Sequence, residues 1–367
     1  MSARRERRGG FMMSNEVILV TGFPGFIAGR LVERLARDGA HFLLLVQPAF
    51  VERARKEIAR IAEATGTTPE SFRVVEGDIT HEDLGLTTSD LEEARELTTS
   101  VFHLAAIYDL GVRRDTALRV NVEGTRNVNR FAQSLPNLRR YHYVSTCYVA
   151  GKRTGVILES ELRHTAGFRN HYEETKYLAE LEVDALKDEL PVTIHRPAVV
   201  CGDSLTGETA KYDGIYYLIN YLRMWPGALS LANIGNAEVR LNVVPVDFVV
   251  EAMSALARDE RAVGATVQLA DPAPLTTQEL FDVISKNLAG RRSLLTVPAS
   301  LVHTSLRLPL SEKVSRLPRI GVPYFFLKQT YDTALARELL DPHGVRCPRF
   351  PDYVPALLDF VERHPKL

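Results

Sequence analysis

The chain has 367 residues, of which 45% are hydrophobic and 25% are charged, and this composition excludes a collagen-like, coiled-coil or disordered chain. With 45 basic and 46 acidic residues the formal net charge is −1, so no global positive field favours nucleic-acid binding. The three cysteines, Cys147, Cys201 and Cys347, form no C-x-x-C pair. Their spacing argues against a disulfide framework or a metal site and favours a reducing, cytoplasmic location.

Residues 1–13 contain several arginines but no apolar stretch of the length that a signal peptide needs, so we expect a disordered tail there. Nowhere do about 18 apolar residues follow one another, and no transmembrane segment is expected.

The first half of the chain alternates β-like runs with helical patterns, which predicts an α/β fold, a Rossmann-type doubly wound parallel sheet with crossover helices. Apolar runs predict strands at 16–20, 42–46, 72–76, 101–105, 141–146 and 192–200. Helical spacing predicts helices at 25–37, 51–64, 90–98, 116–133 and 172–187.

After Gly202 this alternation ends. Tyr217, Tyr221 and Trp225 fall on one face of a predicted helix, which suits either a core or a pocket. Strands follow at 241–246 and 267–270, and then a helix that opens with a capping box and stops at Gly290. We expect a nucleotide-binding core at 14–203 plus about 236–272, and a smaller substrate-binding region at 204–235 plus 273–367.

The turn after the first predicted strand is rich in glycine. Gly22 permits a tight turn, Gly25 lets the backbone approach a pyrophosphate, and Ala28 lets the helix pack on the strand. The N–H groups and positive dipole at that helix start suit a diphosphate. Because this motif opens the first β-α-β unit, it favours a dinucleotide site over a structural turn.

The end of the second predicted strand discriminates between two cofactors. An acid there would hold the adenosine ribose hydroxyls, whereas an arginine would accept a 2′-phosphate. This chain has Gln47 and no acid, and Arg30, Arg53 and Arg55 are near in sequence. The pattern favours NADP(H), although solvated helix faces explain the arginines equally well, and NAD(H) stays open.

Tyr172 and Lys176 are four residues apart on a predicted helix, so both side chains lie on one face. A tyrosine titrates near ~10, and an adjacent ammonium favours its phenolate. Such a pair also occurs by chance on surfaces. A second feature favours a catalytic role for the pair: Ser145-Thr146 lies at the carboxyl end of a predicted strand, and parallel sheets of this kind bind ligands at the carboxyl ends of their strands. His103 and His195 are expected as packed core histidines, and Cys147 as a small strand residue.

These motifs resemble the extended short-chain dehydrogenases/reductases over about 16–270. The shared motifs are Thr21-Gly22-x-x-Gly25-x-x-Ala28, Gly77-Asp78-Ile79, His103-Leu104-Ala105-Ala106, Asn121-Val122-x-Gly124-Thr125, Val144-Ser145-Thr146, Tyr172-x-x-x-Lys176 and His195-Arg196-Pro197. Asn170-x-Tyr172-Glu173-x-Thr175-Lys176-x-x-x-Glu180 resembles the fatty acyl-CoA and thioester reductase, or male sterility, branch.

The resemblance implies roles for individual residues. Thr146 would hydrogen-bond the substrate oxygen, Tyr172 would be the acid/base and Lys176 its electrostatic partner, while Asn121 would support a proton-relay water. The cofactor would be held by Gly22, Phe23, Gly25, Phe26, Ile27, Gln47, Asp78, Ile79, Ala105, Ala106, Lys176 and Pro197. The substrate would meet Tyr108, Tyr217, Tyr221 and Trp225. Gln47 departs from the arginine that thioester reductases usually place there.

The expected function is therefore an NADP(H)-dependent reductase that transfers hydride to the carbonyl of a hydrophobic substrate. The substrate would be a fatty acyl thioester, on CoA or a carrier, or an aldehyde. The alternatives are an NAD(P)-dependent secondary-alcohol or hydroxysteroid-type dehydrogenase or ketoreductase, and a non-catalytic dinucleotide-binding protein. A homodimer is compatible with the sequence.

Overall fold

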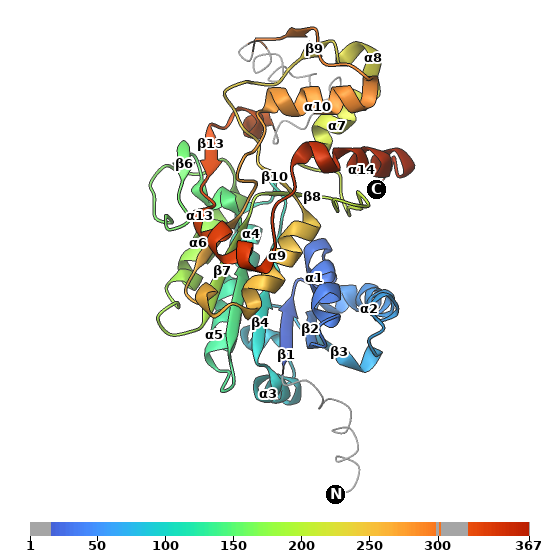
Figure 1. The fold of residues 1–367 in the computed structure, drawn as a ribbon. Coiled ribbons are helices and arrows are strands. Elements are labelled where there is room, and N and C mark those ends of the chain that lie inside the picture. Colours follow the sequence, from blue (N-terminus) through green and yellow to red (C-terminus); the bar gives the residue numbers. More distant parts are fainter. Residues whose placement is uncertain (1–15, 299–300, 302–321, 367) are drawn as a thin grey trace, which may run out of the picture. The chain divides into compact units, whose positions relative to one another are not determined.

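The computed structural model describes residues 16–298, 301 and 322–366 (Figure 1). The tail expected at residues 1–13 lies outside these ranges. The chain divides into two units. Unit 1 comprises Met1–Val149, Phe168–Arg196 and Val250–Val267, and unit 2 comprises Ala150–Gly167, Pro197–Val249 and Gln268–Leu367.

Unit 1 is built on a seven-stranded sheet with the order β11-β7-β5-β4-β1-β2-β3. The strands are β1 Val17–Thr21, β2 His41–Val46, β3 Phe72–Glu76, β4 Ser100–His103, β5 Arg140–Val144, β7 Val192–Pro197 and β11 Thr266–Leu269. The pairs from β3 through β7 are parallel. Strands such as β1 are buried along their whole length, as expected where helices cover both faces of a parallel sheet.

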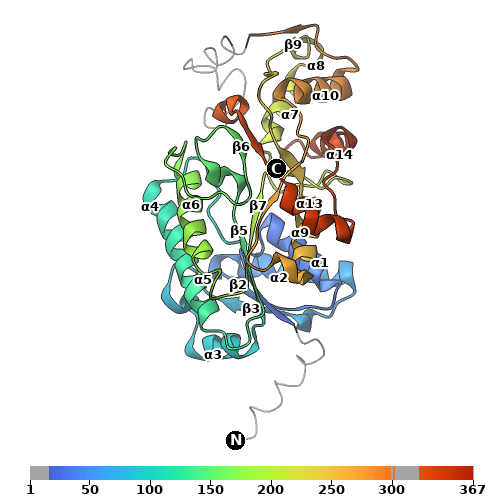
Figure 2. The same ribbon diagram turned by 60° about the vertical axis from the view of Figure 1, so that its left-hand side comes forward.

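Helices lie on both faces of this sheet (Figures 1 and 2). α1 Phe26–Ala36 and α2 Val51–Thr65 cover one face, while α5 Gly124–Gln133 and α6 His171–Asp184 cover the other. α3 Thr88–Leu97 precedes β4, and α9 Val246–Arg258 precedes β11. The strand order reverses between β1 and β4, which is where such sheets bind their ligands. The predicted doubly wound α/β fold is confirmed.

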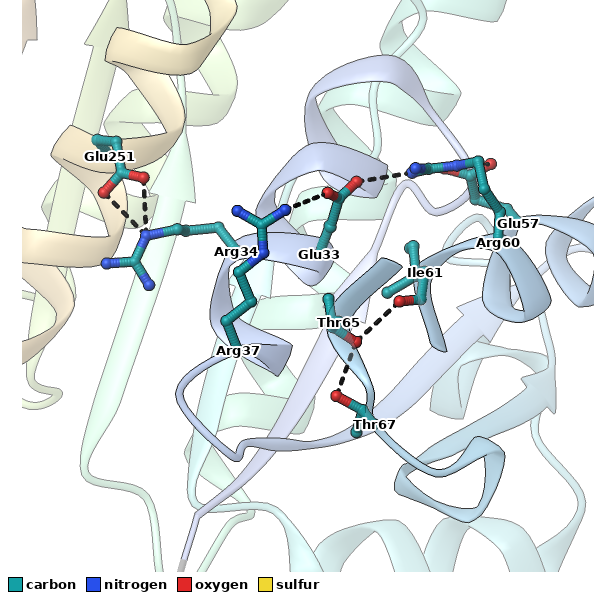
Figure 3. Close-up of polar contacts among 9 residues, drawn as sticks. All are labelled: Glu33, Arg34, Arg37, Glu57, Arg60, Ile61, Thr65, Thr67 and Glu251. Atoms are coloured by element: carbon teal, nitrogen blue, oxygen red, sulfur yellow. Dashed lines mark hydrogen bonds and ion pairs between the residues drawn. The ribbon is translucent and has the colours of Figure 1, made fainter. Parts of the chain in front are cut away.

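Ion pairs tie α1 to two other helices of unit 1 (Figure 3). Glu33 accepts hydrogen bonds from Arg37 at 2.7 Å and from Arg60 of α2 at 2.9 Å. Arg34 donates through Nε to both carboxylate oxygens of Glu251 on α9, at 2.8 Å each. These contacts fix the helix whose N-terminus follows the glycine-rich turn.

The helix predicted at 116–133 has three parts. α4 Arg114–Ala117 leads into a π-helical turn at Leu118–Glu123, and α5 continues to Gln133. A π-turn holds one more residue than an α-turn and often marks a functional position. Here it contains Asn121, which is 1% exposed.

Unit 2 contains short strands and a helical group. Its strands are β6 Gly155–Ile157, β8 Val199–Cys201, β9 Ala232–Asn233, β10 Val243–Pro245, β12 Leu295–Thr296 and β13 Gln329–Tyr331. Its helices are α7 Ile215–Met224, α8 Pro226–Leu229, α10 Thr277–Ala289, α13 Ala334–Leu340 and α14 Phe350–Arg363. The predicted capping box of Thr276 with Glu279, and the stop of α10 at Gly290, are confirmed.

The single strand expected at 192–200 is wrong. The structure has two strands, β7 and β8, and β8 pairs with β10 in a separate two-stranded sheet. Pro197 closes β7, and a proline has no N–H with which to continue the ladder. Beyond it, Ala198 donates to the Leu269 carbonyl at 3.1 Å and Val199 to the Asn242 carbonyl at 3.1 Å.

The prediction that Tyr217, Tyr221 and Trp225 share one helical face is wrong for Trp225. Tyr217 and Tyr221 lie on α7 and are half-buried, but Trp225 follows the last residue of the helix and is 71% exposed. Its backbone is non-helical, at φ −149° and ψ 76°, because Pro226 disfavours a helical conformation at the preceding residue. The buried face of α7 instead contains Tyr216, whose hydroxyl accepts from the Gly202 N–H at 2.9 Å.

Among the described residues, no helix has both the length and the apolar character needed to cross a membrane. Likewise, no group of three or more His, Cys, Asp or Glu side chains in those ranges is placed to hold a metal ion.

Candidate functional site

The turn between β1 and α1 has room for backbone only at Gly22 and Gly25. Gly22 has φ +90°, and a Cβ there would lie 2.8 Å from the Ala105 nitrogen. A Cβ on Gly25 would lie 2.6 Å from the Gly22 oxygen, to which Gly25 already donates its N–H at 2.8 Å. Two glycines therefore keep side chains out of the place where α1 begins.

The start of α1 suits an anion. Its N-cap, Gly25, offers no side-chain hydrogen bond, and the first turn contains no acidic residue. The first N–H groups of a helix have no partner within the helix and carry its positive dipole end. The bare turn and the uncapped helix thus fit the diphosphate of a dinucleotide.

We expect Gly25→Val to lower the affinity for either nicotinamide dinucleotide by about 100-fold or more, because its Cβ would collide with the Gly22 oxygen and displace the turn that receives the diphosphate. Fluorescence titration with NADPH and NADH measures this. Gly227→Val is the matched control, since a Cβ at Gly227 of α8 meets nothing within 4 Å. Equal loss of affinity in both variants, or retained affinity in Gly25→Val, would contradict the assignment.

Gln47 and Asp78 meet at the ends of neighbouring strands. Gln47 Nε2 donates to Asp78 Oδ2 at 2.9 Å, and Asp78 Oδ1 accepts from the Thr80 N–H at 2.8 Å. Ile79 is 6% exposed and belongs to the core, where its carbonyl accepts from Asn127 Nδ2 at 2.7 Å. The structure therefore brings Gln47 and Asp78, two of the predicted cofactor residues, together and buries Ile79, a third.

Asn121 connects the loop after β4 to α6. Its Oδ1 accepts from the Ile107 N–H at 2.8 Å, and its Nδ2 donates to Thr175 Oγ1 at 3.0 Å. Ala105 is held in the same loop by its N–H, which donates to Thr21 Oγ1 at 3.1 Å. Asn121 therefore helps to order the loop that contains Ala105 and Ala106, two of the residues expected to hold the cofactor.

Tyr172 and Lys176 are both buried, at 6% and 3% exposure. Asn170 caps α6 by accepting from the Glu173 N–H, which sets the helix start just before Tyr172. The ring of Tyr172 meets that of Tyr108 edge-on, with centroids 5.1 Å apart. Tyr108, the predicted substrate contact in unit 1, thus lies directly beside the predicted acid/base.

The ammonium of Lys176 is held by the end of β5. Its Nζ donates to the Tyr143 hydroxyl at 2.8 Å and to the Val144 carbonyl at 2.8 Å. Burial lowers the pKa of Lys176 from 10.5 to about 7, while the Glu180 carboxylate opposes that shift. Lys176 therefore titrates near neutral pH, where its charge is sensitive to each neighbour.

Ser145 and Thr146 have different surroundings. Ser145 Oγ donates to the Glu180 carboxylate, which also accepts from Arg196 Nε at 2.8 Å. This ion pair is almost fully buried, with side-chain exposures of 2% for Arg196 and 0% for Glu180. Thr146 Oγ1 accepts from the Tyr148 N–H at 3.2 Å, which leaves its own proton for another acceptor.

Phe23, Phe26 and Ile27, the other predicted cofactor residues of unit 1, line the turn and first helical residues; Phe23 is buried and the other two half-buried. The remaining predicted site residues, Pro197, Tyr217, Tyr221 and Trp225, belong to unit 2. Sequence reasoning missed Tyr143, which holds Lys176. The only available signal was its place in a predicted strand, two residues before Ser145.

A doubly wound sheet, a glycine turn at its first crossover, and a Tyr-x-x-x-Lys pair beside the strand that leads into Ser145-Thr146 define an extended short-chain dehydrogenase/reductase. A sequence profile described as male sterility protein matches residues 20–253, and the chain belongs to this family.

Relatives and solved structures agree with that assignment. Glycine betaine reductase ATRR of Emericella nidulans is 28% identical over 286 residues, covering 73% of this chain and 22% of that protein. Fatty acyl-CoA reductase wat of Drosophila melanogaster is 25% identical over 281 residues, covering 66% of this chain and 54% of that protein. This chain thus spans about a fifth of the first relative and about half of the second.

The terminal R domain of the myxalamid PKS-NRPS biosynthetic pathway has a similar fold, with a TM-score of 0.80 at 24% identity. That likeness covers 97% of this chain and 92% of the R domain.

Proposed function

We propose that this protein is an NADP(H)-dependent reductase that acts on the carbonyl of a fatty acyl thioester or aldehyde. The observation that carries the proposal is the buried pair of Tyr172 and Lys176, with Lys176 hydrogen-bonded to the strand end that leads into Thr146. Relatives named fatty acyl-CoA reductases support the substrate class.

A bound nicotinamide dinucleotide would supply the hydride. Gly22, Gly25 and the start of α1 would hold its diphosphate, and Lys176 would direct an N–H to its ribose. Gln47 and Asp78 would lie at the adenosine end. The absence of an acid at the end of β2 supports NADP(H), since that position usually selects the nucleotide by its 2′ substituent.

The residues of the site would stabilise charge as it develops on the carbonyl oxygen. The Thr146 and Tyr172 hydroxyls would both donate to that oxygen. With an aldehyde, Tyr172 would give up its proton and leave an alcohol. With a thioester, the carbon–sulfur bond would break, the thiolate would leave, and an aldehyde would remain. The Lys176 ammonium would favour the phenolate that Tyr172 becomes.

A substrate screen tests the proposal. The protein is assayed for oxidation of NADPH and NADH with acyl-CoAs and aldehydes of increasing chain length, cyclic ketones and nucleotide sugars. We expect NADPH to be used, with efficiency that rises along the chain-length series, at about 0.8 kcal/mol per buried methylene, and then levels off. Activity confined to ketones would favour the ketoreductase alternative, and activity confined to nucleotide sugars would overturn the proposal.

Substitutions of Ser145 and Thr146, the two hydroxyl residues that follow β5, should affect activity and stability differently. We expect Thr146→Val to lower kcat by about 10²-fold or more, because an oxyanion donor is lost. Ser145→Ala should lower the free energy of unfolding by about 1–3 kcal/mol, since it removes a donor from a buried carboxylate, and should cost less activity. Steady-state kinetics and urea unfolding measure both. A larger activity loss in Ser145→Ala than in Thr146→Val would mean that Ser145, and not Thr146, donates to the substrate oxygen.

A further inference from the structure

A row of buried polar side chains crosses the sheet of unit 1. Thr21, His103 and Tyr143 are register partners on β1, β4 and β5. Thr21 Oγ1 lies 2.7 Å from His103 Nδ1, and His103 Nε2 lies 3.0 Å from Thr125 Oγ1 on α5. These four residues are each at most 1% exposed, so their hydrogen bonds exclude water.

The direction of each hydrogen bond in this row follows from Thr125. Its hydroxyl donates to the Asn121 carbonyl at 2.6 Å, so its oxygen can only accept from the row. Burial lowers the pKa of His103 to about 3, and the ring is therefore neutral. His103 must then donate from Nε2 to Thr125 and accept at Nδ1 from the Thr21 hydroxyl.

Tyr143 packs against His103, with ring centroids 5.5 Å apart. Burial raises the pKa of Tyr143 well above 10, so the phenol keeps its proton. Its oxygen is then the acceptor for Lys176 Nζ, which also lies 4.4 Å from the centroid of the Tyr143 ring. The Val144 carbonyl takes a second N–H of Lys176.

We propose that Tyr143 is a positioning residue for Lys176: its phenol oxygen and ring fix the ammonium so that one N–H points to the cofactor ribose. Through His103 the same row reaches Thr21, which holds the loop at Ala105. Tyr143 thus links the lysine to the turn that receives the diphosphate. The inference rests on the proposed function, because it assigns Lys176 to nucleotide binding.

Other ionisable groups also face Lys176. Glu180 lies one turn further along α6 and is paired with Arg196 of β7. Tyr172 lies one turn earlier on the same helix, and His103 of β4 is neutral. All of these groups are present in Tyr143→Phe and in the unaltered protein. A difference in pH dependence between these two proteins is therefore due to the Tyr143 hydroxyl.

Tyr143→Phe keeps the ring and removes the oxygen that accepts from Lys176. The ammonium then loses a partner that favours its charged form, so its pKa falls further. Affinity for the nucleotide should decline as pH rises through the titration of Lys176, since the neutral amine is a weaker donor to the ribose. We expect the midpoint of this decline to lie about one pH unit lower in Tyr143→Phe than in the unaltered protein.

Tyr141→Phe is the matched control. Tyr141 lies two residues earlier on β5, is 0% exposed, and donates to Asn129 Oδ1 at 2.6 Å. Its replacement removes an equally buried hydroxyl on the same face of the sheet. It should lower thermal stability and leave the pH midpoint unchanged. Lys176→Ala should remove the pH dependence.

The experiment is a fluorescence titration with NADPH from about pH 6 to 9 for the four proteins. A lower midpoint in Tyr143→Phe alone supports the inference. A midpoint shared by Tyr143→Phe and the unaltered protein, or no pH dependence in either, overturns the inference while leaving the proposed reductase intact. Failure of the unaltered protein to bind NADPH or NADH at any pH overturns both.

Discussion

Tyr172→Phe is expected to lower turnover by about 10²- to 10⁴-fold, which is the usual contribution of a general acid/base. Nucleotide affinity should stay nearly unchanged, because the ring remains and only the hydroxyl is lost. The ring is 6% exposed and packs edge-on against Tyr108, so stability should change little. Steady-state kinetics with the best substrate of the screen, together with NADPH titration, measure both quantities.

Tyr177→Phe serves as the control on the same helix. Tyr177 packs against Phe168 with ring centroids 5.1 Å apart, and lies five residues beyond Tyr172 on α6. Its variant should keep turnover within about twofold of the unaltered protein, as expected of a residue that does not handle the proton. If both variants were equally active, Tyr172 would not be the acid/base.

The second large effect is on stability at acid pH. His103, His142 and His195 are fully buried within the sheet, and His142 Nδ1 lies 3.1 Å from His195 Nε2. Burial lowers the pKa of His103 and of His195 to about 3, and burial together with His195 and Arg140 lowers that of His142. All three must stay neutral in the folded protein.

The sign follows from proton binding. Below about pH 6.5 the unfolded chain takes up protons on these histidines and the folded protein does not. The free energy of unfolding therefore decreases as the pH is lowered. Their contribution is complete above about pH 6.5 and is lost below it, at up to about 4 kcal/mol per pH unit for three groups. Urea unfolding at several pH values measures the slope.

His142→Asn should reduce that slope by about 1.4 kcal/mol per pH unit, because one titrating group is removed. The exposed His81 provides the control, and His81→Asn should leave the slope unchanged. Equal slopes in all three proteins would show that the buried histidines do not control acid stability.

Much of the sheet could be predicted, because parallel strands are continuous apolar runs bounded by turns. The prediction of 72–76 coincides with β3, for example. The residues from Val192 to Val200 were predicted as one strand because β7 and β8 are both apolar. The two strands are distinguished only by their pairing, since β7 belongs to the seven-stranded sheet and β8 pairs with β10. Trp225 was misplaced because helical spacing continues through the sequence while Pro226 ends the helix.

The candidate site could be predicted only in part. Glycine spacing and the Tyr172–Lys176 interval are local, so they are visible in the sequence. The contacts of Lys176 are not, since they join β5 to α6, and Tyr143 and Lys176 are 33 positions apart in the sequence. Nor does the sequence reveal that Ser145 serves the buried Glu180. Such partners are chosen by the packing of distant segments.

Hydride transfer to a substrate carbonyl is most directly tested with NADPH that carries deuterium at the transferring position of C4. The protein is incubated with this nucleotide and a long-chain acyl-CoA or aldehyde, and the product is examined by mass spectrometry. We expect deuterium at the former carbonyl carbon of the product, and we expect this product to form more slowly with Tyr172→Phe, in proportion to its turnover. A nucleotide that binds but never gives its deuterium to any carbonyl substrate would contradict this expectation.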